Sequence, residues 1–209
     1  MKGLLTKEIY LACTSAVFLY VPVFIVLGLI LKNPFFLTYI GVFFAVMPIS
    51  LMSFDETSRW DRYVLGMPFS RRTIVTAKYA VTLILAAFAC VIMLLMSLVL
   101  AGGGSMSLEA SLPVMASSVA LSLIFPTVLY PLNFKLGTTK ARMAMLVLVG
   151  AVTGGMVLLS TRHSIIGDLT VKMRNTSPAV FCGIGAAVLL ALFAASWALS
   201  VRFYTKREF

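Results

Sequence analysis

The residues best suited to chemistry lie together in one internal stretch, ETSRWDRYVLGMPFSRR, which runs from Glu56 to Arg72. It mixes carboxylates and guanidinium groups with a Trp and a Tyr, while the sequence on both sides is mostly apolar. Groups of both signs beside aromatic rings suit the recognition of a protein surface. Charge sets the orientation of a partner, and aromatic side chains supply buried contact area. The stretch therefore predicts a docking element.

Groups that would support catalysis are missing from the sequence. It has no Gly-x-x-x-x-Gly-Lys-[Ser/Thr] pattern, the pattern with which a P-loop binds ATP phosphates. The single histidine, His163, has no second His or Cys at the spacing of a metal site, and no Ser-His-Asp or Cys-His set can be built around it. We therefore expect no enzyme activity, no metal and no cofactor in this chain.

The surrounding sequence is too apolar for a soluble domain. Of the 209 residues, 61% are hydrophobic and 11% are charged, whereas ordinary domains carry about a quarter charged residues. A membrane-spanning helix needs about 20 mainly apolar residues, and six stretches meet this requirement. The sequence thus predicts one all-α polytopic membrane domain over residues 1–209. The predicted spans are about residues 14–31, 35–54, 74–101, 112–132, 143–159 and 179–201.

Basic residues orient the predicted spans. Six spans place both termini on one side, and that side receives 13 of the 17 Lys and Arg residues, all except Lys32, Arg162, Lys172 and Arg174. Because basic residues are enriched in cytoplasmic loops, we expect the termini and the charged stretch to be cytoplasmic. The net charge of +10 then reflects membrane orientation and contact with anionic headgroups, and it requires no nucleic acid.

The predicted spans offer few groups for ion coupling. Proton- and ion-coupled carriers usually bury ionisable residues inside the bilayer, and we expect no buried Asp, Glu, His or Arg in these spans. They contain instead Phe, Met and Leu with scattered hydroxyl groups. This composition suits a hydrophobic or amphipathic cargo.

The charged stretch divides into two helical pieces. Apolar side chains recur at helical spacing from Trp60 to Met67, which predicts a short amphipathic helix over about residues 55–67. Gly66 and Pro68 are expected to end this helix. Ser70 is expected to cap the next helix, which continues into the third span.

Two interpretations of the short helix remain open on its residues alone. Trp60 and Tyr63 could anchor it among lipid headgroups, as aromatic residues commonly do. The carboxylates of Asp55, Glu56 and Asp61 favour a protein partner, because an anionic lipid surface gains nothing from them. Elsewhere, residues 1–12 fit an interfacial cytoplasmic segment, and residues 164–174 fit either an outer interfacial helix or an irregular loop.

The charged stretch resembles the first cytoplasmic loop of permease subunits from type 2 ATP-binding-cassette (ABC) exporters. The matching positions are Glu56, Trp60, Arg62-Tyr63, Pro68, Ser70-Arg71 and Lys78-Tyr79. The stretch YPLNFKLGTTKAR is similar to the second cytoplasmic loop of that family. Its matching positions are Pro131, Phe134, Lys135, Gly137 and Lys140.

The resemblance implies a function. In the family, the first loop forms a coupling helix that docks in a groove of a separate ATPase subunit, which binds ATP and Mg²⁺. Two ATPase subunits and two permeases, identical or similar, form the transporter. The small size is similar to that of bacterial plasma-membrane permeases that include exporters of amphipathic peptide toxins and antimicrobial peptides. The alternative is a non-transporting membrane protein, such as an immunity or assembly factor, that docks a cytosolic partner.

The residues expected to contact the ATPase subunit come from both cytoplasmic loops. They are Asp55, Glu56, Arg59, Trp60, Asp61, Arg62, Tyr63, Pro68, Arg71, Lys135 and Lys140. These loops do not assign the cargo, because exporters of peptides, lipids and drugs share them.

Overall fold

The described part of the chain is almost entirely helical. The computed structural model describes residues 2–33, 35–103, 108–137, 140–141, 143–144, 147 and 178–206, and no strand occurs among them. The helices are α1 (Lys2–Thr14), α2 (Ala16–Leu31), α3 (Phe35–Thr57), α4 (Trp60–Leu65), α5 (Arg71–Gly102), α6 (Leu108–Leu136) and α9 (Pro178–Lys206).

Most of these helices can cross a membrane. Within the described ranges, α3, α5, α6 and α9 are each long and apolar enough, and the bent pair of α1 and α2 would add a fifth span. The predicted span over residues 143–159 lies almost wholly outside the described residues, as does the segment 164–174. The protein is an all-α polytopic membrane protein, as the sequence predicted.

The N-terminal part of the chain forms two helices joined at a bend. We expected the first membrane helix to begin near Thr14, after an interfacial N-terminal segment, and α2 begins close to that position. In the structure, α1 ends at Thr14 and α2 starts at Ala16, with an angle of 53° between the two helices. Ser15 lies at the bend with extended backbone, and its hydroxyl donates to the carbonyl of Ala12 at 2.7 Å. The N-terminal segment is therefore a helix of its own, which contacts α3 and α5.

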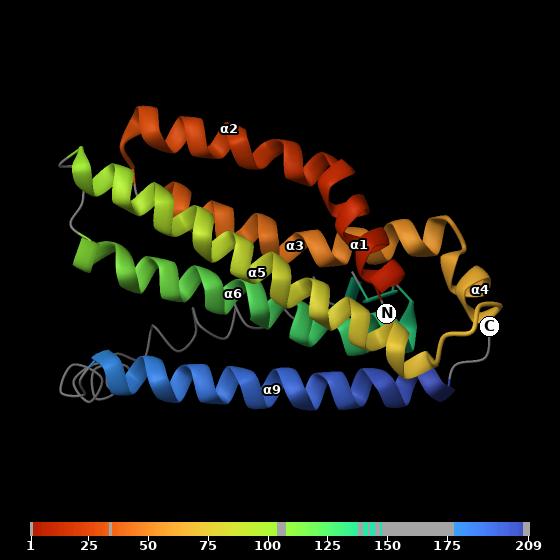
Figure 1. The fold of residues 1–209 in the computed structure, drawn as a ribbon. Coiled ribbons are helices and arrows are strands. Elements are labelled where there is room, and N and C mark those ends of the chain that lie inside the picture. Colours follow the sequence, from red (N-terminus) through yellow and green to blue (C-terminus); the bar gives the residue numbers. More distant parts are fainter. Residues whose placement is uncertain are drawn as a thin grey trace.

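The long helices lie side by side (Figure 1). In this view α2 forms one edge and α9 the opposite edge, with α3, α5 and α6 between them. The start of α1 and the end of α9 lie at the end of the bundle that also carries α4. This arrangement agrees with the expectation that the termini and the charged stretch share one side of the membrane.

Apolar packing between α3 and α5 forms one part of the core. Ile40, Phe44 and Met47 of α3 share a buried cluster with Val81 and Met93 of α5. These side chains are at most 2% exposed. Apolar side chains also cover the exposed faces of both helices, as expected for helices that face lipid on one side and the bundle on the other.

Buried hydroxyl groups fasten α9 to the neighbouring helices. The Tyr79 hydroxyl on α5 lies 2.7 Å from the Ser196 hydroxyl and 2.8 Å from the Ser200 hydroxyl, both on α9. Ser196 in turn donates to the carbonyl of Thr127 on α6 at 2.6 Å. Hydrogen bonds between membrane helices stabilise their association, because a polar group left alone in an apolar interior is costly. The pairing of these hydroxyl groups was not predicted from the sequence.

A close helix contact occurs at Gly41 of α3. A Cβ atom at this position would lie 2.7 Å from the Cβ of Ser118 and 2.9 Å from its carbonyl oxygen, both on α6. Only glycine permits such an approach between helix backbones, and small residues are common at membrane helix contacts.

Candidate docking site for a cytosolic partner

The short helix of the charged stretch starts later than expected. We expected it to begin at Asp55, but α3 continues to Thr57 and α4 begins at Trp60. Asp55 and Glu56 therefore belong to the end of α3. The break lies at Arg59, whose φ of 54° is in the left-handed region. This conformation interrupts the helix and turns the chain, although it is unusual for a residue with a side chain.

The two faces of α4 have different environments. Val64 is completely buried, in the same cluster as the partly buried ring of Trp60. Tyr63 is 64% exposed, and its ring centre lies 5.5 Å from that of Trp60. The residues of the predicted apolar stripe therefore face different surroundings. Val64 packs α4 against the bundle, and Tyr63 remains available to a partner. Asp61 and Arg62 also lie in α4, but their side chains are outside the described part.

The connection from α4 to α5 follows the expected signals. Gly66 ends α4, and its N–H donates to the carbonyl of Tyr63 at 3.2 Å. Pro68 is exposed in the connection. The Ser70 hydroxyl accepts from the backbone N–H of Thr73 at 3.2 Å, so it caps α5 as predicted.

Arg71 connects the start of α5 to the end of α9. Its guanidinium donates to the carbonyl of Thr205 at 2.8 Å and to that of Tyr204 at 3.4 Å. Cationic groups stabilise the carbonyls at a helix C-terminus, which carry a partial negative charge. Arg71 therefore has an internal structural contact in addition to its predicted role in docking.

Four charged side chains meet where α1, α3 and α5 come together. Lys78 of α5 donates to Asp55 of α3 and, at 3.3 Å, to Glu8 of α1. Lys7 of α1 donates to the other oxygen of Asp55 and lies 3.2 Å from Glu8. We call this group the buried charge cluster. The side chains of Glu8, Asp55 and Lys78 are each 5% exposed, and that of Lys7 is 21% exposed.

The buried charge cluster corrects the expectation for Asp55. This residue, near the end of α3 and one position past the predicted span over residues 35–54, is buried. Its carboxylate faces Lys7 and Lys78 inside the protein, whereas we had grouped it with the surface that meets a partner. The physical reason is charge balance: two ammonium groups and two carboxylates compensate each other, which makes their burial tolerable.

The buried charge cluster touches α4 through Lys7. The Lys7 ammonium lies 4.5 Å from the centre of the Trp60 ring, which is within the range of a cation–π interaction. Trp60 therefore has Tyr63 on one side and Lys7 on another. Sequence reasoning did not single out Lys7 or Glu8. Lys78 was visible as a charge within an apolar run, but nothing in the sequence indicated its partners.

The second predicted loop begins at the end of α6. This helix continues through Pro126 and Pro131, and it ends before Gly137, which has a φ of 82°. Such a value favours glycine. Lys135 is exposed, and its ammonium lies 5.5 Å from the ring centre of Phe203 on α9. Lys140 is also exposed.

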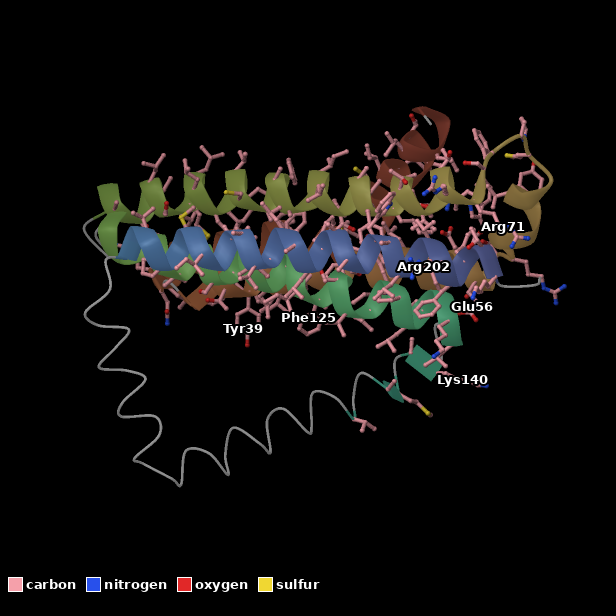
Figure 2. All side chains as sticks on the ribbon, turned by 90° about the horizontal axis from the view of Figure 1, so that it is seen from below. Tyr39, Glu56, Arg71, Phe125, Lys140 and Arg202 are labelled. Atoms are coloured by element: carbon pink, nitrogen blue, oxygen red, sulfur yellow. The ribbon has the colours of Figure 1, made fainter. Side chains whose placement is uncertain are left out.

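The exposed charges of both loops lie on the same end of the molecule. Figure 2 shows Glu56, Arg71, Arg202 and Lys140 at that end, whereas Tyr39 and Phe125 lie farther along the bundle. The described chain thus brings the two predicted loops together at one end. It forms a surface with both signs of charge, and α4, which carries the exposed ring of Tyr63, lies at the same end.

Comparison with known proteins gives the class of this protein. The sequence matches the family described as "ABC-2 family transporter protein" over residues 3–205. No curated protein and no solved structure matches it. Because the match covers nearly the whole chain, the protein belongs to the ABC-2 transporter family. It is a multi-pass membrane component of an ABC transporter that partners an ATPase subunit and is not itself the ATPase.

Proposed function

We propose that the chain is the permease subunit of an ATP-driven exporter in the bacterial plasma membrane. It moves a hydrophobic or amphipathic cargo outward, and peptide toxins and antimicrobial peptides are the first candidates to test. The family supports the permease role. The apolar helices and their scattered buried hydroxyl groups support an amphipathic cargo.

The proposed site of energy input is the surface around α4. This short helix is inserted between α3 and α5, two helices that can cross the membrane. The observation that carries the proposal is the position of Tyr63, exposed on α4, with Val64 buried beneath the same helix. A partner that binds Tyr63 and the neighbouring charges would contact an element packed against the bundle. Its movement would therefore act on the membrane helices.

The proposed assembly contains two ATPase subunits and two permeases. The second permease is either another copy of this chain or a similar one. Exposed apolar side chains on α9, such as Ile184, Val188 and Leu192, support burial against lipid or a second permease. In this proposal the ATPase subunits bind ATP and Mg²⁺, and this chain binds neither.

Reconstitution tests the proposed function. The tagged chain is purified from membranes with and without the P-loop ATPase that copurifies with it, and both samples are placed in liposomes. We expect ATP hydrolysis only in the complex, and ATP-dependent movement of cargo away from the ATPase side. Robust hydrolysis by the chain alone, or docking without any transport, would contradict the proposal. The cargo is sought by comparing peptides in culture medium from cells with and without the gene.

A further inference from the structure

The orientation of α4 depends on contacts made by few side chains. With residues Trp60–Leu65, α4 is too short to be stable on its own. It follows the left-handed residue Arg59, which separates it from the regular backbone of α3. Burial of Val64 fastens one face of α4 to the bundle. Trp60 makes the other contact between α4 and the bundle, and the Lys7 ammonium lies over its ring.

Lys7 differs from the other members of the buried charge cluster. It is the most exposed of the four, and its ammonium lies over the Trp60 ring of α4. The Asp55 carboxylate accepts from both Lys7 and Lys78, so it joins α1 to α5 through α3. An ammonium shared between a carboxylate and an indole ring has its position set by the carboxylate. Lys7 thus links the three helices of the cluster to α4.

We propose that Lys7 is a positioning residue that holds Trp60, and with it α4, in one orientation on the bundle, and that Asp55 fixes Lys7 in place. Displacement of α4 would pull on Lys7, and through Asp55 and Lys78 on α3 and α5. The role of this link in transmitting movement from a partner rests on the proposed docking function of α4. The contact itself lies within one chain, so it can be tested without the ATPase subunit.

Variants that differ in the charge balance of the cluster distinguish a positioning role of Lys7 from a purely stabilising one. The intact cluster has two cations and two anions. Lys7→Met leaves one excess negative charge, and Asp55→Asn leaves one excess positive charge. The double variant is balanced again and keeps the pair of Lys78 and Glu8. A cluster that only stabilises the fold should recover in the double variant. The orientation of Trp60 should not recover, because the ammonium beside its ring is still missing.

Tryptophan fluorescence of the full chain in lipid nanodiscs provides the test. The chain has two Trp residues, so Trp197→Phe leaves Trp60 as the sole reporter and serves as the reference background. Emission wavelength and acrylamide quenching report the surroundings of Trp60, and Tm reports stability. Lys206→Met, which removes an exposed Lys from α9, is the matched control.

We expect Lys7→Met to raise the population of released Trp60 rings by about two- to fivefold, the factor that corresponds to losing a cation–π contact. The Lys7→Met/Asp55→Asn variant should regain Tm relative to Asp55→Asn while Trp60 stays released. Lys7→Arg should keep the parental signal, because a guanidinium also stacks on indole. Lys206→Met should change neither readout. Parental quenching in folded Lys7→Met, or recovery of both readouts in the double variant, would overturn the proposal. Loss of ATPase docking would not affect these outcomes, so the two proposals fail separately.

Discussion

Lys78 of α5 and Asp55 of α3 form a buried ion pair, although 23 residues separate them in the chain. Both side chains are 5% exposed, and each has a second charged partner on α1. The pair lies where the membrane helices meet the surface loop that contains α4. It is therefore placed to set the geometry between the membrane domain and the candidate docking surface.

Removing one partner of this pair should destabilise the protein strongly. Asp55→Asn leaves two ammonium groups facing one carboxylate, and Lys78→Met leaves two carboxylates facing one ammonium. Either change should cost about 3–5 kcal/mol, because an uncompensated charge stays buried. Thermal unfolding in nanodiscs measures the effect, with Arg72→Met, at an exposed position, as the control. Equal Tm values for Asp55→Asn and the control would rule out a stabilising ion pair.

Tyr79→Phe should loosen the attachment of α9. The change removes one hydroxyl and leaves the hydroxyls of Ser196 and Ser200 without that partner. We expect a loss of about 1–3 kcal/mol, the usual cost of an unsatisfied buried polar group. Hydrogen–deuterium exchange should increase in α9. Tyr10→Phe is the control, since Tyr10 is 72% exposed, and a similar response of the two variants would refute the proposed fastening role.

Gly41→Ala should disturb the contact between α3 and α6. The new Cβ would meet Ser118 at 2.7 Å, where no side chain fits without movement of the helices. Overpacking of this kind costs about 1–3 kcal/mol. Gly185→Ala on α9 is the matched control, because nothing lies within 4 Å of its added Cβ, and it should be neutral or stabilise the helix by about 1 kcal/mol. Tm decides the matter: a tolerated Gly41→Ala would show that the two helices are not in close contact.

Charge reversal distinguishes a protein partner from a lipid surface. We expect the Glu56→Lys/Asp61→Lys variant to bind the ATPase subunit more weakly, because the partner would meet charge of the wrong sign. On an anionic membrane the same added lysines would be favourable. Asp55 is left unchanged in this variant, since its carboxylate is buried. Pull-down of the ATPase in detergent and in bilayers measures the effect, and undiminished binding in both would support lipid anchoring instead.

Local signals in the sequence predicted much of the fold. Hydropathy located α3, α5, α6 and α9, because a bilayer imposes both length and apolar composition. Ser70 identified the start of α5, since capping is a property of a single residue. The charged composition of the loop also predicts a surface for a partner, which stays a prediction.

Other features depended on contacts between distant residues. The continuation of α3 past Asp55 and the break at Arg59 were not predictable, because helix ends respond to packing as well as to local propensity. The burial of Asp55 depends on Lys7 and Lys78. A carboxylate next to a Glu looks exposed in a sequence, and only the fold supplies the two ammonium groups that permit its burial.

The central claim is that α4 docks the ATPase subunit, and the affinity between the two subunits tests it most directly. The dissociation constant is measured in nanodiscs for the parent, for Tyr63→Ala, and for Tyr20→Ala, which removes an exposed ring from α2. An aromatic anchor at an interface contributes about 2 kcal/mol or more, so Tyr63→Ala should bind roughly thirtyfold more weakly. Tyr20→Ala should bind like the parent. Parental affinity of a folded Tyr63→Ala variant would contradict the claim.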